Sequence, residues 1–351
     1  MLWRSGVYAR SGWWAEGVSG TVAGVVGVAF LVALVLVPVL VRFAIGRNLL
    51  DVPNARSSHE IPTPRLGGLA VIAGVWAAAP FISESFLFLA AATLAGLVGV
   101  LDDFVDLPFW MKAAGQATVA FILLFLVPPP ISLAAGPLWP LALLFGVVWI
   151  VAVVNAFNFM DGVDGIAGGT AILNVLFLAA LAGTSGLGAS LAALAAAVAG
   201  FLVWNVSPAR IFLGDSGSHF VGFFLGAVAL YTEPMGGPGV PYAPYLAFLV
   251  AAAVFTPFLF DTAFTLARRA TARKNIFAAH REHIYQRITP DPASHRQVSI
   301  VYFAFSALSG IAAVLASGGT LLRLLAGGVL IFGLCLFMTF LPRIAAGKGY
   351  M

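Results

Sequence analysis

Four polar side chains recur at three-residue spacing in one short segment of this chain: Asn155, Asn158, Asp161 and Asp164. On a helix, this spacing turns each group about 60° from the last and gives a polar ribbon that curls around the axis. Gly162 favours a break in the helix, which lets the backbone approach a ligand closely. An apolar chain keeps buried carboxylates only where water, a metal ion or a charged partner compensates them. The segment therefore indicates a ligand site.

A second acidic group, made of Asp102, Asp103 and Asp106, ends an apolar run. On a helix, Asp106 lies one turn from the other two, so all three can face one cavity. Neighbouring carboxylates repel one another unless a cation lies among them, and Mg²⁺ is typically held by one or two carboxylates together with substrate phosphates. The alternative is a solvated helix end. Lys112, about two turns further along, suits either a phosphate contact or an anchor at the membrane interface.

Two further segments place polar groups at the start of an apolar run. Asp215 and Ser216 lie between glycines just before the run 218–232. A helix start there would combine free N–H groups, the positive end of the helix dipole and a metal-binding carboxylate. The alternative is an ordinary helix cap by Asp215 or Ser218. Arg65, followed by two glycines, begins another apolar run in the same way.

A basic segment near residue 280 contains His280, Arg281, His283 and Arg287. Two histidines one turn apart suit zinc, but no cysteine and no adequate third ligand is nearby. The planar donors of arginine match phosphate oxygens, so diphosphate recognition is the favoured interpretation, and attraction to anionic lipid is the alternative. We expect part of residues 275–287 to form a short amphipathic surface helix.

Asp261 is an acid within an apolar run. An ionisable group in a membrane segment is functional by default. The alternative is a structural pair with Arg268 or Arg269, which follow it by about two turns.

Composition excludes an ordinary soluble domain, because 61% of the 351 residues are hydrophobic, 9% are charged and the mean hydropathy is +1.01. Apolar runs of roughly 20 residues match a bilayer core about 30 Å thick. The sequence therefore predicts one all-α, polytopic membrane domain with about eleven transmembrane helices. These are residues 20–44, 66–82, 86–101, 113–128, 138–155, 166–183, 187–204, 218–232, 244–266, 298–316 and 320–341.

The distribution of Lys and Arg residues predicts how this domain is oriented in the membrane. With eleven spans and the N-terminus outside, one face receives the C-terminus and all Lys and Arg residues except Arg4, Arg10 and Arg323. The positive-inside rule makes that face cytoplasmic. Residues 1–17, with three tryptophans, are expected to form an interfacial segment, and residues 267–297 a cytoplasmic loop that completes the site.

Five segments, read in order, resemble the polyprenyl-phosphate N-acetylhexosamine-1-phosphate transferase family (glycosyltransferase family 4). They are residues 51–68, 101–106, 155–165, 212–217 and 280–287, so the resemblance covers about residues 45–290. The last segment is most similar to the branch that initiates O-antigen. There, as here, a His followed by Tyr285 and Gln286 replaces the usual His-x-His-His. This departure argues against the peptidoglycan enzyme of the family and leaves the sugar open.

The resemblance implies a reaction in the bacterial cytoplasmic membrane, with the active site facing the cytoplasm. UDP-N-acetylhexosamine and undecaprenyl phosphate would give polyprenyl-diphospho-N-acetylhexosamine and UMP, with Mg²⁺ as cofactor and Mn²⁺ as a substitute. The product would start a cell-surface polysaccharide. The resemblance implies membrane lipid as a further partner and no nucleic acid. It leaves open whether the protein forms a homodimer.

The resemblance also implies a role for each matching residue. The metal ligands would be Asp215 and Asp103. The catalytic residues would be Asp102, Asp103, Asp161 and His283, with Asp102 or Asp103 binding or deprotonating the lipid phosphate. The substrate-binding residues would be Asn155, Asn158, Asp164, Phe212, Arg65, Lys112, His280 and Arg281, with Phe212 stacking on uracil and Lys112 meeting the lipid phosphate.

Two other classes of membrane protein fit the sequence less well. An ion-coupled transporter would place its acids near the bilayer midplane, whereas these acids gather at one face. A CDP-alcohol phosphotransferase would carry Asp-Gly-x-x-Ala-Arg and two later acids, which the segment after Asp164 lacks. Phosphoryl transfer needs positioning and charge neutralisation more than covalent chemistry, so direct attack by the lipid phosphate is favoured over a phospho-Asp intermediate.

Overall fold

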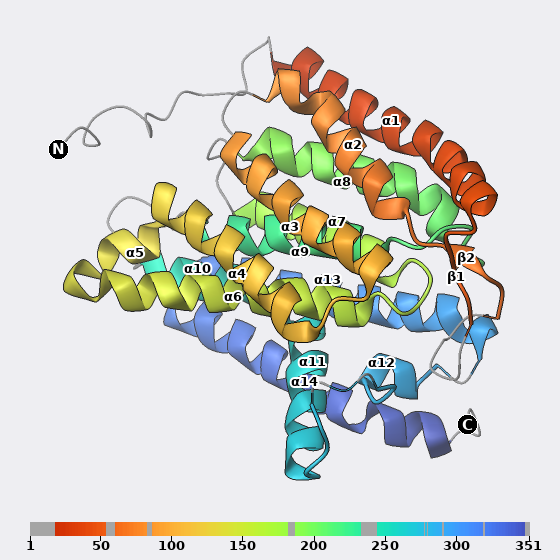
Figure 1. The fold of residues 1–351 in the computed structure, drawn as a ribbon. Coiled ribbons are helices and arrows are strands. Elements are labelled where there is room, and N and C mark those ends of the chain that lie inside the picture. Colours follow the sequence, from red (N-terminus) through yellow and green to blue (C-terminus); the bar gives the residue numbers. More distant parts are fainter. Residues whose placement is uncertain are drawn as a thin grey trace.

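The protein is described here from a computed structural model. The structure describes residues 18–53, 60–82, 86–181, 187–232, 244–276, 278, 280–289, 291–318 and 320–347. The predicted interfacial segment 1–17 lies outside these residues. Most of the described chain is helical, and the longer helices run side by side in one bundle (Figure 1).

The bundle is built from twelve helices of ten residues or more in the described chain. They are α1 (Val18–Arg47), α2 (Gly67–Ala78), α3 (Phe86–Val105), α4 (Phe109–Leu126), α6 (Trp139–Met160), α7 (Ile166–Leu181), α8 (Gly188–Asn205), α9 (Gly214–Leu230), α10 (Pro244–Ala253), α11 (Thr256–Thr271), α13 (His295–Ser317) and α14 (Leu321–Gly347). The short elements are β1 (Leu50–Asp51), β2 (Thr63–Pro64), η1 (Ala79–Phe81), α5 (Pro130–Ala134), η2 (Gly136–Leu138), α12 (Ile284–Arg287) and η3 (Pro292–Ser294).

Seven helices within the described ranges are long and apolar enough to cross a membrane, and α10 with α11 make an eighth if that bent pair is one span. The prediction of an all-α polytopic membrane protein is confirmed. The count of eleven is not, because α2 and α7 are shorter than a full span and the 17 residues of α9 include Asp215 and His219. A helix or the α10–α11 pair nevertheless coincides with each predicted apolar run.

Helix α9 is the centre of the bundle. All of its residues except Asp215 are buried, and α2, α3, α6, α7 and α10 pack against it. Glycines permit this close packing. A Cβ on Gly222 would lie 2.9 Å from the Cα of Val154 on α6. Small residues let membrane helices approach each other in this way, so a helix that begins with a carboxylate can be enclosed by protein.

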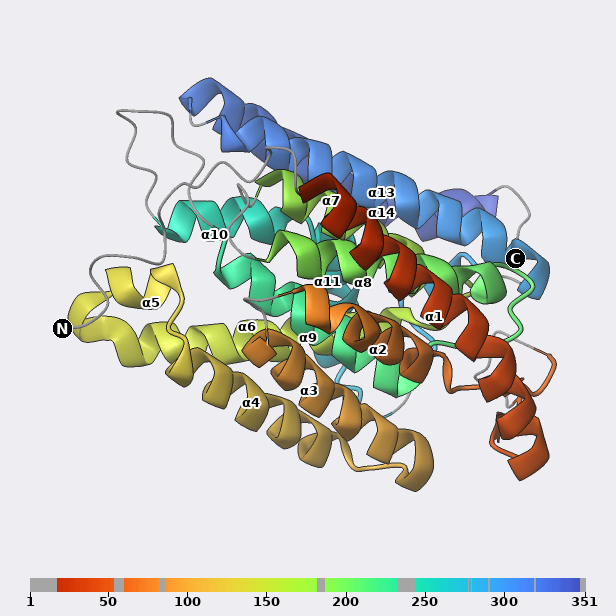
Figure 2. The same cartoon turned by 90° about the horizontal axis from the view of Figure 1, so that it is seen from above.

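Of the short elements, α5 lies at the left end of the bundle in Figure 1, whereas β1, β2 and α12 lie toward the right end. There β1 pairs with β2 in antiparallel register, with Leu50 opposite Pro64, and α12 and the end of α14 lie nearby. Helix α11 lies crosswise because it is bent by 82° from α10. The view from above shows α13 and α14 along one side and α3 and α4 along the opposite side, with α1, α2 and α8 between them (Figure 2).

Two local predictions are wrong. Helix α3 ends at Val105, and Asp106 follows it with φ +54° and an exposed side chain, so it does not continue the helix beside Asp102 and Asp103. The expected amphipathic helix within residues 275–287 is reduced to α12, only four residues long. Hydrogen bonds to side chains, described below, hold the rest of that loop in place of helical hydrogen bonds.

Candidate active site

The start of α9 is held by an acid from α3. The backbone N–H groups of Asp215 and Ser216 each donate to a carboxylate oxygen of Asp103, both at 3.1 Å. An anion at a helix N-terminus satisfies free N–H groups and interacts favourably with the helix dipole. The capping role that the sequence offered to Asp215 or Ser218 is therefore filled by Asp103, and the Asp215 side chain is directed elsewhere.

The Asp215 carboxylate lies among side chains from three other helices. Asn158 Nδ2 on α6 donates to its Oδ1 at 2.8 Å. Lys112 Nζ on α4 lies 3.8 Å from its Oδ2 and 2.7 Å from Asp102 Oδ2. The Asp102 carboxylate on α3 is itself a neighbour of Asp215. The Asp215 side chain is 27% exposed and that of Asp102 is 7% exposed, so Asp215 is the more accessible of these two carboxylates.

Asp161 joins this group from the end of α6. Burial raises the pKa of its carboxyl well above the usual range, and the like charges of Asp215 and Asp103 raise it further. A hydrogen bond with the backbone of Gly214 connects it to the start of α9. We call Asp102, Asp103, Asp161 and Asp215 the acid cluster. Its carboxylates outnumber the single lysine among them, which is the charge pattern of a cation site.

Glycines allow the backbone to reach the acid cluster. A Cβ on Gly99 of α3 would lie 2.2 Å from the carbonyl oxygen of Asp215, and one on Gly68 would lie 2.1 Å from the nitrogen of Gly217. Gly214 has φ +73°, a conformation that favours glycine. The close approaches explain why the acids of α3 can lie directly against the start of α9.

The Pro-rich loop is tied to the segment before α9. Phe212 N–H donates to the carbonyl of Pro64 at 2.8 Å, and Gly67 N–H donates to the carbonyl of Phe212 at 2.9 Å. This pairing brings Arg65 and Phe212 beside the acid cluster, and the Arg65 side chain forms an ion pair with Asp51. Arg65 and Phe212 therefore both lie beside the site that the sequence predicted.

Asp164 lies to one side of the acid cluster. Its carboxylate accepts from the N–H of Ala209 at 3.0 Å and lies 3.2 Å from His295 Nδ1. Burial opposes ionisation, but the hydrogen bond and charge of His295 outweigh it, so the pKa of Asp164 is lowered. Ser299 Oγ also donates to the Asp164 carbonyl at 2.7 Å. Asp164 thus joins the α8–α9 loop to the start of α13.

Asn155 also points away from the acids. Its Nδ2 donates to Gln116 Oε1 at 2.7 Å, one helical turn deeper in the bundle than Asn158. The four polar side chains at three-residue spacing therefore do not form one continuous surface, because they contact different parts of the protein. Asn158 and Asp161 face the acid cluster, whereas Asn155 and Asp164 bind other parts of the protein.

The basic segment is organised around Asp261. This carboxylate is fully buried and lies 3.2 Å from His283 Nδ1. It also accepts from the N–H groups of Ile284 and Tyr285 at 2.8 and 3.0 Å and from the hydroxyl of Tyr302. The alternative that paired Asp261 with an arginine is wrong.

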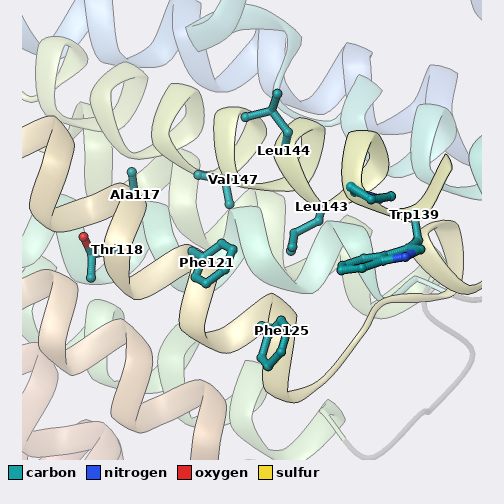
Figure 3. A pocket seen from close by; sticks show the side chains of 9 residues that line it. Ala117, Thr118, Phe121, Phe125, Trp139, Leu143, Leu144 and Val147 are labelled. Carbon is teal, nitrogen blue, oxygen red and sulfur yellow. The ribbon is translucent and has the colours of Figure 1, made fainter.

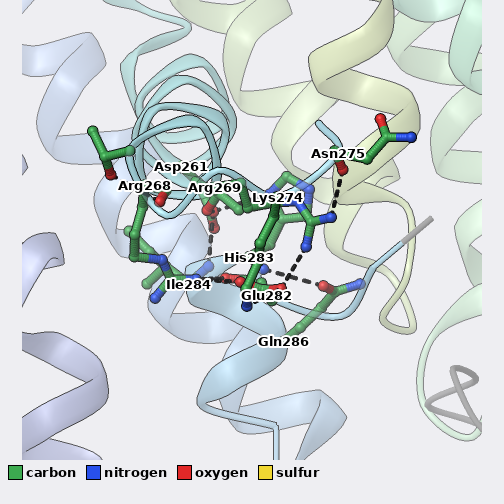
Figure 4. A network of polar contacts seen from close by, with 11 residues as sticks. Asp261, Arg268, Arg269, Lys274, Asn275, Glu282, His283, Ile284 and Gln286 are labelled. Carbon is green, nitrogen blue, oxygen red and sulfur yellow. Dashed lines mark hydrogen bonds and ion pairs between the residues drawn. The ribbon is translucent and has the colours of Figure 1, made fainter. Parts of the chain in front are cut away.

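The neighbouring arginines bind Glu282 instead (Figure 4). Arg269 forms an ion pair with the Glu282 carboxylate, Lys274 Nζ lies 3.0 Å from it, and Arg268 Nη2 lies 3.7 Å from it. Arg269 also donates to the carbonyl of Asn275 at 2.6 Å. Two acids therefore hold the loop. Glu282 binds three cationic side chains, and Asp261 binds backbone N–H groups of the loop.

This loop lies against the end of α6. Tyr285 donates its hydroxyl to the carbonyl of Phe159 at 2.9 Å, two residues before Asp161. The His280 and His283 rings stack with centroids 4.9 Å apart. Burial, together with the charges of His283 and Arg269, lowers the pKa of His280 to about 4, so His280 is neutral at pH 7.

Arg281 is an exposed basic group of this loop, as is Arg287. Its guanidinium donates to the carbonyl of Thr289 at 3.5 Å. His283, in contrast, is 3% exposed. Of the basic residues that the sequence assigned to diphosphate recognition, Arg281 is therefore open to solvent and His283 is enclosed.

An apolar pocket of about 550 Å³ lies between α4 and α6 (Figure 3). Its lining is almost free of polar groups and consists of Ala117, Thr118, Phe121, Phe125, Trp139, Pro140, Leu143, Leu144 and Val147. It begins five residues after Lys112 on the same helix.

Sequence reasoning missed several residues that shape the site: Gly99, Gln116, His219 and His295. For Gly99, Gln116 and His219 the only signal was a polar or glycine residue within an apolar run, and His295 lies in the loop before the run 298–316. Across the described ranges, no three His, Cys, Asp or Glu side chains form a ready-made metal site.

Known proteins with similar sequences point to one family. The family model described as glycosyl transferase family 4 matches residues 85–233. A probable undecaprenyl-phosphate N-acetylglucosaminyl 1-phosphate transferase of Bacillus subtilis is 29% identical over 335 residues, which cover 90% of each chain. The undecaprenyl-phosphate alpha-N-acetylglucosaminyl 1-phosphate transferase of Thermotoga maritima is 31% identical over 263 residues, 73% of this chain and 79% of the relative. Its namesake from Yersinia pestis is 28% identical over 88% of this chain and 89% of its own. The chain therefore belongs to glycosyl transferase family 4, among the polyprenyl-phosphate hexosamine-1-phosphate transferases.

Proposed function

We propose that this protein transfers N-acetylhexosamine 1-phosphate from a UDP-sugar to undecaprenyl phosphate and releases UMP. The observation that carries the proposal is the convergence of Asp102, Asp161, Asp215 and Lys112 at one end of the bundle. The relatives, named as undecaprenyl-phosphate N-acetylglucosaminyl 1-phosphate transferases, support the same reaction. The basic residues at this end support a cytoplasmic active site, with eleven spans, an external N-terminus and location in the bacterial inner membrane.

The lipid acceptor fits helix α4. Lys112 is a cation suited to the acceptor phosphate, and the pocket that begins at Ala117 is apolar enough for isoprenoid units. Five residues of helix span about 7.5 Å, so one extended lipid can reach both features. In this proposal Asp102, 2.7 Å from Lys112, orients the lysine and accepts a proton if the acceptor phosphate arrives as a monoanion.

The donor set suits Mg²⁺. This ion uses one or two carboxylates together with substrate phosphates, and it does not require a ready-made site of three protein ligands. Asp215 is the proposed ligand because its side chain is partly exposed and lies among the other acids of the cluster. Asp103 supports it, and each of its oxygens keeps a second lone pair beyond the backbone N–H that it accepts. When bound, the ion would neutralise charge on the diphosphate.

The proposed chemistry is direct attack. An oxygen of the lipid phosphate forms a bond to the phosphorus that carries the sugar, and the bond from that phosphorus to the UMP oxygen breaks with its electron pair leaving on UMP. Asp102 orients Lys112, and Asp215 would hold the cation that neutralises charge on the diphosphate. Phosphoryl transfer requires this kind of positioning and charge neutralisation from a protein. No phospho-Asp intermediate is needed.

The donor side is proposed to lie between the segment before α9 and the 280–287 loop. Phe212 would stack on uracil, and Arg281 would meet the diphosphate, as its exposure allows. Neutral His280 would donate a single hydrogen bond. His283 is assigned to holding this loop through Asp261, and Asp164 to holding the α8–α9 loop, in place of direct substrate contacts.

The test is an assay of the purified protein with Mg²⁺, undecaprenyl phosphate and a panel of UDP-N-acetylhexosamines. We expect release of UMP and formation of a lipid-linked diphosphosugar with at least one donor. Asp215→Asn should be inactive, with Asp106→Asn as the matched control at an exposed acid. Reaction with CDP-linked substrates alone would contradict the proposal. The donor that reacts fastest identifies the sugar and shows whether the O-antigen-like motif predicts it.

A further inference from the structure

A second group of polar side chains lies one helical turn deeper in the bundle than the acid cluster. Gln116 on α4 bonds to Asn155 on α6 and to His219 on α9. Gln116 is 0% and His219 1% exposed. Each lies three or four positions from a site residue of its own helix, and so on the same helix face. The pairs are Lys112 with Gln116, Asn158 with Asn155, and Asp215 with His219.

The backbone sets the direction of these hydrogen bonds. Asn155 Nδ2 donates to the carbonyl of Val151 at 2.8 Å and to Gln116 Oε1 at 2.7 Å. Because Gln116 Oε1 is the acceptor, Gln116 Nε2 is the donor, and it lies 3.3 Å from His219 Nε2. His219 Nε2 must therefore accept. The ring proton then lies on Nδ1, which interacts with the backbone of Ala95, and the imidazole is neutral.

The surrounding charges do not require a charged imidazole. The charged groups that act on His219 are Lys112 on α4 and Asp102 on α3. They form an ion pair with each other at 2.7 Å. A second proton on His219 would point an N–H at the amide nitrogen of Gln116, and reversing that amide would break its bond to Asn155.

The three side chains restrict how their helices can rotate. If one turns away, a donor or acceptor is left unpaired in an apolar interior, which is costly. Helices α4, α6 and α9 are the ones that carry Lys112, Asn158 and Asp215. A rotation that breaks the deeper hydrogen bonds would therefore also change the distances within the acid cluster.

We propose that Gln116, Asn155 and His219 form a positioning layer that sets the rotation of α4, α6 and α9 and requires a neutral His219. None of the three touches the substrate, so Asn155 takes a positioning role in place of the substrate contact predicted from the sequence. The inference deepens the proposed function, because the groups that it positions are those assigned to phosphoryl transfer.

The first test does not depend on activity. Nitrogen-15 NMR of histidine-labelled protein should show one ring protonated on Nδ1 that does not titrate between about pH 5 and 8. Its signals are assigned by their loss in His219→Gln. A His219 ring that is protonated on Nε2, or that becomes charged in this range, overturns the proposal.

The second test separates positioning from substrate binding. His219→Leu removes the acceptor, whereas His219→Gln places an oxygen close to the position of Nε2. We expect kcat to fall about 10- to 100-fold in His219→Leu, with both KM values within about 3-fold of wild type. His219→Gln should recover most of the rate. Equal losses in the two variants overturn the proposal.

A matched pair of variants controls for burial. Asn155→Leu and Asn174→Leu both replace an amide inside the bundle by a group of similar size. Asn155 is partly buried, whereas Asn174 on α7 is buried and has no hydrogen-bond partner among the described residues. Asn155→Leu should lower kcat, and Asn174→Leu should not. The double variant Asn155→Leu/His219→Leu should lose little more rate than either single variant, since one layer is broken in all three. Additive losses, or a rise in KM alone, overturn the proposal.

These results remain distinct from failure of the proposed function. If the wild-type protein uses no UDP-sugar, the proposed function fails, and the NMR measurement still decides whether the layer exists. If His219→Leu does not fold, the folded His219→Gln and Asn155→Leu variants decide the kinetic question.

Discussion

Asp261 and Asp215 are both acids on helices of an apolar bundle, yet their surroundings are opposite. Asp261 is 0% exposed and binds His283, two backbone N–H groups and the Tyr302 hydroxyl. Asp215 has one amide donor, a lysine at 3.8 Å and a partly exposed side chain, with other carboxylates beside it. A carboxylate whose hydrogen bonds are complete stabilises structure, whereas one with excess negative charge around it can take up a cation and a substrate.

The largest effect on activity is expected from Asp215→Asn. The change removes the exposed charge of the acid cluster, so turnover should fall by about 1000-fold, as for loss of a major transition-state contact. Thermal stability should stay the same or rise, since repulsion with Asp102 and Asp103 is relieved. UMP release and thermal unfolding measure the two effects. If Asp215→Asn lost stability and kept its activity, Asp215 would be a structural acid like Asp261.

Asp261→Asn should have the opposite profile. Removing one partner from a buried, charged hydrogen-bond group costs about 3 to 5 kcal/mol. We expect a large drop in the thermal unfolding midpoint and release of the loop that contains His283. Tyr302→Phe, which removes a single donor to Asp261, is the milder control. Normal stability of Asp261→Asn would show that this carboxylate is not a structural centre.

Gly99→Ala tests how closely α3 must approach the acid cluster. The added Cβ would lie 2.2 Å from the carbonyl of Asp215, so the helix start has to move. Overpacking of this kind costs about 1 to 3 kcal/mol, and activity should fall with stability. Gly46→Ala, where a Cβ meets nothing within 4 Å, is the matched control. Similar behaviour of the two variants would show that close approach at Gly99 is not required.

The raised pKa of Asp161 predicts a pH effect in metal-free protein. Its folded pKa exceeds the unfolded value, so the contribution to stability is complete below about pH 4 and declines as pH rises through the folded pKa. The unfolding midpoint should therefore fall over that range. Mg²⁺ or Asp161→Asn should remove the decline. A midpoint that rises through this range, or that ignores Mg²⁺, would separate Asp161 from the proposed cation site.

Asp106→Asn should have the smallest effect. Asp106 is exposed beyond the end of α3, although it is only three positions from Asp103. We expect a change in kcat/KM of less than about 3-fold, well below any transition-state contribution. A loss comparable to that of Asp215→Asn would extend the acid cluster to this residue.

Much of the fold was predictable because membrane helices are recognisable from apolar length alone. The exact span count was not, since α9 combines a short apolar run with Asp215 and His219. The acids of the site were predictable because charge is costly in an apolar chain. Their division into roles was not, because Asp103 and Asp164 differ in their partners rather than in residue type.

The sequence by itself determined that this is a helical membrane protein whose acids lie at helix ends. Burial cost acts on each residue according to its type, so composition and spacing were enough to find them. Only the tertiary structure decided that Asp215 is partly exposed among other acids, that Asp261 holds His283, and that Gln116 joins Asn155 to His219. These contacts join residues far apart in the chain, and hydrogen-bond direction and distance exist only once the helices have packed.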